Sequence, residues 1–270
     1  MIGGALGGHE DRNVSVRNSP FLLLARVGFA ARGFMYLLVA WMALRLGRTE
    51  DPGAALEYLG TGSGRLVLAA MAVGFAGYSA WRLTDAALNT DGDSLGHRIA
   101  AAASGVIHLG FGFTAAKLAL GERQSGTATA ETGAADVMDL PGGEALLYAV
   151  AAALLGGAAF QFIVAVRRRF LRRMAPEAAR RWWIVAAGVA GYATRGILFA
   201  MAAWLMFRAA SDHVAAEAGG LGDALHAVPA SLRAAVAAGL ALFGTFSLLE
   251  ARYRVISDPH VEDRIGSLAG

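Results

Sequence analysis

The chain contains no cysteine, so disulfide bonds, thiolate metal sites and cysteine nucleophiles are excluded. Only 17% of its residues are charged, and a net charge of +3 is too small to indicate nucleic-acid binding. Motifs of phosphate loops, serine hydrolases and zinc peptidases are absent; the string GTGSG at 60–64 is not followed by Gly-Lys-Ser/Thr. We therefore expect no enzyme, no cofactor and no bound metal.

Apolar residues dominate what is present. They make up 56% of the 270 residues, with a mean hydropathy of +0.48, which is typical of a polytopic membrane protein. Six segments reach the roughly 20 apolar residues that a membrane span needs: 21–46, 65–88, 98–120, 144–166, 183–208 and 232–254. The third span carries Ser104, His108, Thr114 and Lys117, so we expect it to be shielded within the bundle.

The distribution of basic residues predicts the topology. The N-terminal side of the six spans holds 15 of the 24 basic residues and the other side holds 7. The positive-inside rule therefore places both termini in the cytoplasm of a bacterial inner-membrane protein. The first 20 residues lack a basic segment followed by an apolar one, so we expect no cleaved signal peptide. We expect the arginine-rich linker 167–183 to act as a topology anchor, with Trp182 and Trp183 at the interface, or, alternatively, to contact anionic lipid.

Three repeats are visible when the spans are aligned in pairs. The odd spans align as FAARGFMY (29–36), AAASGVIH (101–108) and YATRGILF (192–199). The loops at 54–65, 135–144 and 223–233 align loosely and predict short interfacial helices. The polar segment 121–143 is otherwise expected to be mobile. Of the even spans, 73–86 aligns with 238–251, which places Asp85 opposite Glu250.

The middle unit has diverged from the other two. Ser104 stands where the outer units carry arginine. In its even span Gly156 matches Gly74 and Gly239, and this register puts Arg167 at the carboxylate position.

The repeats predict an all-α bundle of three tandem helical hairpins. Two spans per unit return the chain to the same side, so the units are parallel and related by a pseudo-threefold axis along the membrane normal. The expected order is a cytoplasmic tail (1–20), hairpins at 21–88, 98–166 and 183–254, and a second cytoplasmic tail (255–270).

The repeated motif resembles a bacterial membrane-protein family catalogued as domain of unknown function 1206. The resemblance rests on Ala31-Arg32-Gly33, the diverged Ala103-Ser104-Gly105, Thr194-Arg195-Gly196 and the closing Ala251-Arg252-Tyr253-Arg254. It extends over about residues 22 to 256 and implies three tandem two-helix repeats. It implies no activity and no catalytic residue.

Arg32 and Arg195 are the main candidate site residues. Each lies in the middle of an apolar span, where a guanidinium costs at least about 2.5–3.5 kcal/mol on insertion scales. One interpretation is a binding site for an anion or a lipid headgroup, with Ser104 at the same depth and Tyr36, His108 and Phe199 one turn further on. The other, which we favour, is that each arginine clamps neighbouring hairpins through Asp85, Glu250 or a backbone carbonyl.

The remaining candidates have simpler interpretations. Gly33, Gly105 and Gly196 fit close helix packing better than hinges. Asp85 and Glu250 fit local ion pairs with Arg82 and Arg254 better than a proton relay. His108 is the one histidine deep in a span and fits a hydrogen-bonded core residue better than a haem or metal ligand.

Two functional classes follow from these residues. One is a small-solute, ion or lipid binding or transport protein with the two arginines in its lining. The alternative is a non-catalytic structural or regulatory membrane protein whose Arg–carboxylate pairs are clamps. The expected contacts are membrane lipid, an anionic small molecule or headgroup, and partner membrane proteins, without nucleic acid.

Overall fold

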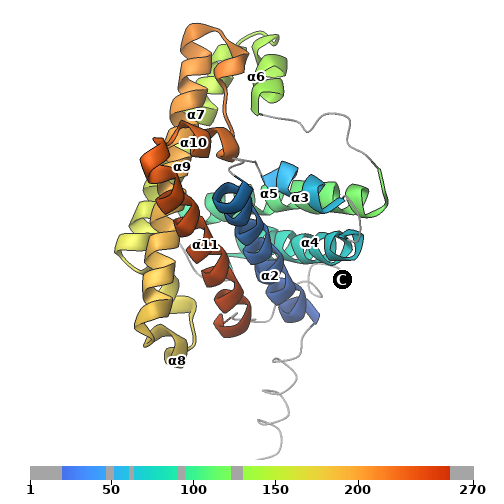
Figure 1. Ribbon diagram of the computed structural model, residues 1–270, viewed down its shortest axis with the longest axis vertical. Helices are drawn as coiled ribbons and strands as arrows, with labels where there is room; N and C mark the ends of the chain where they lie inside the picture. The colour runs from blue at the N-terminus through green and yellow to red at the C-terminus, as the bar shows by residue number, and fades with distance from the viewer. Residues whose placement is uncertain (1–19, 47–51, 61–63, 90–94, 123–129, 256–270) are drawn as a thin grey trace, which may run out of the picture.

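Six long helices make up most of the molecule. The computed structural model describes residues 20–46, 52–60, 64–89, 95–122 and 130–255. In these ranges six helices are long and apolar enough to cross a membrane, which confirms the predicted all-α polytopic fold. They are α2 (Pro20–Trp41, extended by the π-helical turn η1, Met42–Leu46), α4 (Arg65–Leu88), α5 (Leu95–Ala119), α7 (Gly143–Val166), α9 (Trp182–Asp212) and α11 (Ala230–Tyr253) (Figure 1). The predicted tails lie almost wholly outside the described residues.

Short helices connect the two spans of each hairpin. They are α3 (Pro52–Gly60), α6 (Ala130–Met138) and α10 (Leu221–Ala227), close to the three predicted connecting segments. Helix α6 corrects the expectation of a mobile segment at 121–143, because its residues 130–138 are helical. The linker between α7 and α9 contains η2 (Arg169–Arg173) and α8 (Pro176–Ala179), and η3 (Ala215–Glu217) follows α9.

The helices pack in a cyclic order. Each even span makes its most extensive contacts with the odd span of the following unit: α4 with α5, α7 with α9, and α11 with α2. Three equivalent pairs of this kind are what a pseudo-threefold arrangement requires. The orientation of that axis relative to a membrane stays a prediction.

The middle hairpin is splayed open. In the outer units the two spans also pack against each other, α2 on α4 and α9 on α11, whereas described residues of α5 and α7 make at most marginal contact. Figure 1 shows the divergence: α7 and α9 run along the long axis, α4 and α5 run across it, and α2 and α11 slant between them. The space between α5 and α7 is therefore not filled by helix packing.

Helix α5 is less shielded than its polar residues predicted. Only 28% of its apolar window is buried, and Val106, Ile107, Leu109 and Phe113 are exposed. One face packs against α4, and the polar groups on the helix are partly satisfied locally: Nδ1 of His108 lies 2.7 Å from the carbonyl oxygen of Ser104. This local bond gives Nδ1 of His108 a partner from its own helix instead of from a neighbouring one.

The repeated glycines lie at the cyclic contacts. A Cβ atom added at any of them would come within about 3 Å of the preceding even helix, too close without a shift. The contacts are Gly33 with Leu248 of α11, Gly105 with Leu83 of α4, and Gly196 with Phe162 of α7. The same position of each odd span thus sets the closest helix approach.

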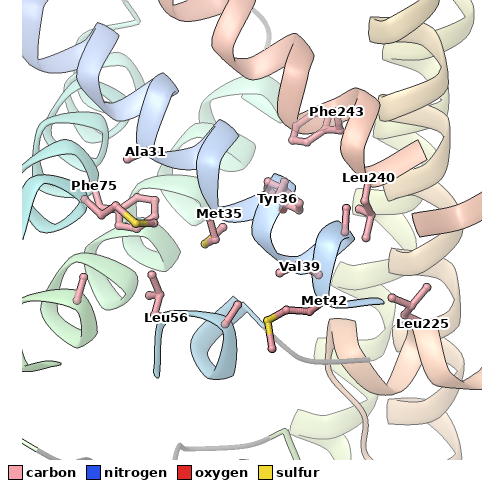
Figure 2. Close-up of a cluster of buried hydrophobic side chains, with 14 of the residues drawn as sticks. Ala31, Met35, Tyr36, Val39, Met42, Leu56, Phe75, Leu225, Leu240 and Phe243 are labelled. Atoms are coloured by element: carbon pink, nitrogen blue, oxygen red, sulfur yellow. The ribbon is translucent and has the colours of Figure 1, made fainter. Parts of the chain in front are cut away.

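The largest buried cluster surrounds α2. Met35, Tyr36 and Val39 project from α2 towards Phe75 of α4 on one side and Phe243 of α11 on the other (Figure 2). The rings of Tyr36 and Phe243 meet edge to face, with centroids 4.9 Å apart. This cluster fixes the helix that carries Arg32.

Candidate functional site

Arg32 is fully engaged by neighbouring helices. Its Nη2 lies 2.5 Å from Oε2 of Glu250 on α11, and its Nη1 donates to the hydroxyl of Tyr78 on α4 at 2.7 Å. Its Nε donates to Oγ of Ser247 at 3.2 Å. The guanidinium also lies within 5.3 Å of the ring centres of Phe29, Tyr78 and Phe243. Arg32 thereby joins the first hairpin to the third.

Glu250 is the centre of this ion-pair network. Its second oxygen, Oε1, accepts a hydrogen bond of 2.7 Å from Nη1 of Arg254. Both partners are buried: Glu250 is 1% exposed and Arg254 is 7% exposed. One carboxylate therefore faces two guanidiniums. Loss of Glu250 would therefore leave two buried guanidiniums without this counter-ion, which is the costly way to break a buried ion pair.

Asp85 forms no ion pair with Arg32 or Arg195 in the described part of the chain. Its Oδ2 lies 3.2 Å from Nη1 of Arg82 and 3.1 Å from Nε2 of His97. His97 lies in the first turn of α5, so this contact joins the first hairpin to the second. Of the two carboxylates at matching repeat positions, Glu250 pairs with Arg32, and Asp85 pairs with neither intramembrane arginine in the described part of the chain.

Arg195 lacks the ionic partner that Arg32 has. Its guanidinium lies over the rings of Tyr36, Phe199 and Phe243, at 5.4, 5.1 and 4.5 Å from the centroids. Its Nε is buried without a hydrogen-bond partner, and no carboxylate in the described part of the chain forms an ion pair with it. Cation–π contacts of this kind contribute about 0.5–2 kcal/mol, which does not replace a counter-ion.

A large cavity opens beside Arg195. Its volume is about 2260 Å³, and its walls come mainly from α5, α7 and α9. Every odd-span residue that the sequence placed around the axis lines it: Arg32, Tyr36, Ser104, His108, Arg195 and Phe199. Its lining reaches from Arg172, in the linker before α9, to Asp223 on α10, so it extends along most of the length of α9.

The packing of α7 aligns it with α4 and α11 differently from the sequence alignment, which matched Gly156 to Gly74 and Gly239. The ring of His108 lies 4.5 Å from that of Tyr78, and Tyr36 makes the equivalent contact with Phe243. Phe199, the third member of the series, instead contacts Gly157, where a Cβ would lie 3.2 Å from the ring. Gly157 therefore corresponds to Tyr78 and Phe243, a shift of three residues from the expected alignment.

This register explains why no carboxylate of the described helices reaches Arg195. Seven residues after Tyr78 comes Asp85, and seven after Phe243 comes Glu250. Seven after Gly157 comes Val164, which is buried. Arg167, which the sequence put at this position, follows the last residue of α7 and is exposed. The contact of Gly196 with Phe162, equivalent to those with Leu83 and Leu248, supports the same register.

His108 carries a second polar atom without a partner. With Nδ1 donating to the carbonyl of Ser104, the other nitrogen, Nε2, is an acceptor. It is buried and has no hydrogen-bond partner among the described residues. His108 lies among Phe75, Tyr78 and Phe111, and it lines the cavity. A metal is not indicated, because the described residues contain no group of three His, Cys, Asp or Glu side chains.

Sequence reasoning missed several residues of the site. Tyr78 and Ser247 bind Arg32, yet both sit in even spans whose polar residues are few. The sequence signal that could have found them is their spacing from the aligned carboxylates: Tyr78 lies seven residues before Asp85, and Ser247 lies three residues before Glu250. Gly157 and Val164 can be recognised as the positions equivalent to Tyr78 and Asp85 only from the helix contacts.

The comparisons assign the chain to a family. The model of the family described as Domain of Unknown Function (DUF1206) matches three segments, 27–89, 99–168 and 190–254. The protein belongs to the DUF1206 family. The three segments coincide with the three hairpins, so a DUF1206 unit is one two-helix repeat.

A bacterial relative extends the comparison over nearly the whole chain. The uncharacterized protein YxxB of Bacillus subtilis strain 168 is 24% identical over 247 residues, which cover 85% of this chain and 90% of the relative. No solved structure matches the chain. The DUF1206 chain is thus a multi-pass membrane protein with a relative in a bacterium.

Proposed function

We propose that this DUF1206 protein binds an anion through Arg195, while Arg32 holds the bundle together. The observation that carries the proposal is the contrast between the two arginines. They occupy the same position of equivalent helices, but Glu250 neutralises Arg32 and Val164 stands where Arg195 would find its carboxylate. A carboxylate or phosphate in the cavity would supply the missing charge in the geometry that a guanidinium favours.

Energetics support a ligand at this position. An arginine in mid-span costs at least about 2.5–3.5 kcal/mol without compensation. The three aromatic rings offset part of this cost, and a bound anion offsets the rest. Arg195 is half-buried and lines the cavity, so an anion can reach it.

Thermal unfolding in a neutral detergent tests the proposal. The five tryptophans provide an intrinsic signal. Sodium phosphate, compared with sodium chloride at equal ionic strength, should raise the Tm of the wild type, because a ligand that binds the native state stabilises it. The rise should disappear in Arg195→Leu and persist in Arg252→Leu, which removes an exposed arginine outside the cavity lining. An equal rise in all three proteins would refute the proposal.

A purely structural role is the second candidate. The network of Arg32, Glu250 and Arg254 favours it, because this network joins the first and third hairpins. On this alternative Arg195 would also be structural, and Arg195→Leu would destabilise the protein as strongly as Arg32→Leu does. The unfolding measurement above separates the two candidates.

The topology belongs to the same proposal. The excess of arginine on the N-terminal side supports cytoplasmic termini in a bacterial inner membrane. On this orientation Arg169 and Arg172 lie at the cytoplasmic mouth of the cavity, where they would attract anions. We propose a binding role without catalysis.

A further inference from the structure

We infer that the ligand of Arg195 is an anionic lipid, which enters sideways between α5 and α7 and places its headgroup at the guanidinium. This inference rests on the proposed function and names its ligand class. It depends on three features: the open middle hairpin, the apolar walls beside Arg195, and Nε2 of His108. Among the described residues Arg195 has no carboxylate partner and this Nε2 has no hydrogen-bond partner.

The outer hairpins show how the middle one would look if it were closed. In the first, Gly28 faces Tyr78 and Gly74 faces Ala31; in the third, Gly191 faces Phe243 and Gly239 faces Thr194. At each of these glycines an added Cβ would overlap its neighbour. Two reciprocal close contacts therefore seal each outer hairpin.

The middle hairpin lacks both seals. In the structural register, the equivalent pairs are Ala100 with Gly157 and Ala103 with Ala153, and all four residues line the cavity instead of touching. Ala100 carries a Cβ where the outer units have glycine. Gly157 has no ring where the outer units have Tyr78 and Phe243. The sequence of this unit thus removes the packing that would shut the space between α5 and α7.

The walls of this opening suit an acyl chain. Ile107 and Phe113 of α5 and Val150 of α7 are exposed apolar residues that line the cavity. A free inorganic anion gains nothing from contact with such walls, whereas an acyl chain that enters from the bilayer core stays in apolar surroundings along them.

The polar end of the cavity matches a headgroup. Arg195 lies near the middle of α9, so a headgroup bound there has left the bilayer surface and needs polar contacts in place of water. The guanidinium would bind the phosphate, and Nε2 of His108 can accept a hydrogen bond from a headgroup hydroxyl. A phosphatidylglycerol headgroup offers both a phosphate and hydroxyl donors.

Native mass spectrometry of the delipidated protein tests the inference. The probes are dioleoyl phosphatidylglycerol and dioleoyl phosphatidylcholine, added in equal amounts in a neutral detergent. The wild type and Arg252→Leu should retain the anionic lipid preferentially. Arg195→Leu should bind it about tenfold more weakly, which corresponds to the loss of one charge-assisted contact of about 1.4 kcal/mol.

Variants at the opening test the contribution of the cavity to lipid binding separately from that of the Arg195 charge. Ala153→Leu places a larger side chain in the cavity at an exposed position of α7, and it should weaken phosphatidylglycerol binding. Ala152→Leu, the exposed neighbour that does not line the cavity, should not. Neither position is packed, so misfolding is not expected to obscure the result.

Each outcome has a distinct meaning. Phosphatidylglycerol binding that is equal in the wild type and in Arg195→Leu overturns the lipid inference. Stabilisation by phosphate through Arg195 without preference for phosphatidylglycerol also overturns it but leaves the anion proposal standing. If neither probe depends on Arg195, both fail.

Discussion

Arg32 donates to Glu250 at 2.5 Å, whereas Arg195, at the same position of the third unit, lies over three aromatic rings and pairs with no carboxylate of the described residues. The difference arises in the even helix that packs against each arginine. Helix α11 presents Glu250, and helix α7 presents Val164 at the equivalent position. One repeat thus has a complete ion pair, and another has the arginine that we propose as the ligand contact.

Breaking the Arg32–Glu250 pair should destabilise the protein strongly. Arg32→Leu leaves the buried Glu250 with Arg254 as its remaining cation among the described residues, and it removes the hydrogen bonds to Tyr78 and Ser247. We therefore expect a loss of about 1.5–3 kcal/mol in the free energy of unfolding. A double-mutant cycle with Glu250→Gln, measured by denaturation in sodium dodecyl sulfate, should give a coupling of about 1–3 kcal/mol. The exposed pair Arg208–Asp212 is the control and should couple by about 0.5 kcal/mol or less. Equal coupling in the two pairs would contradict the clamp.

Removal of Arg195 should have a much smaller effect on stability. Arg195→Leu loses its cation–π contacts, worth about 0.5–2 kcal/mol, but it also removes an uncompensated charge from mid-span. We expect a change within about 1 kcal/mol of zero under the same denaturation conditions. A loss as large as that of Arg32→Leu would show that Arg195 is a clamp.

A carboxylate at position 164 should replace the ligand. Val164→Glu places the carboxylate where Glu250 and Asp85 stand in the other units, so it should pair with Arg195 and abolish stabilisation by phosphate. In the Arg195→Leu background the same glutamate would be buried without a partner and should cost about 3–5 kcal/mol. Val164→Gln, similar in size but neutral, should keep the response to phosphate. A normal phosphate response in Val164→Glu would mean that the structural register of α7 is wrong.

Close helix contacts in the outer hairpins should be intolerant of a methyl group. Gly28→Ala and Gly191→Ala force a Cβ against Tyr78 and Phe243, and each should lose about 1–3 kcal/mol of stability. Gly110 of α5 has open space around its Cβ position, so Gly110→Ala should be neutral or stabilise the helix by up to about 1 kcal/mol. If all three behave alike, helix propensity rather than packing governs these sites.

The spans and their order could be predicted because they depend on the length of apolar segments. All six spans begin within three residues of the predicted positions, and helix α4 matches at both ends. The three connecting helices also fall close to where the loops aligned. These features are local, so one sequence is sufficient to identify them.

The arrangement of the site could not be predicted, because it depends on contacts between helices that one sequence does not reveal. Aligning Gly156 with Gly74 used residue identity, whereas the packing of Phe199 on Gly157 decides the register. The splayed middle hairpin also escaped prediction, since an alanine in place of glycine at position 100 appears harmless until its counterpart Gly28 is seen against Tyr78. The two arginines looked equivalent for the same reason.

The most direct test of the central claim is an experimental structure of the protein in lipid nanodiscs that contain phosphatidylglycerol. We predict that Glu250 forms an ion pair with Arg32. We also predict that non-protein density contacts the guanidinium of Arg195 and continues between α5 and α7. A carboxylate of the protein itself within about 4 Å of Arg195, with α5 packed against α7 and no density between them, would contradict the account.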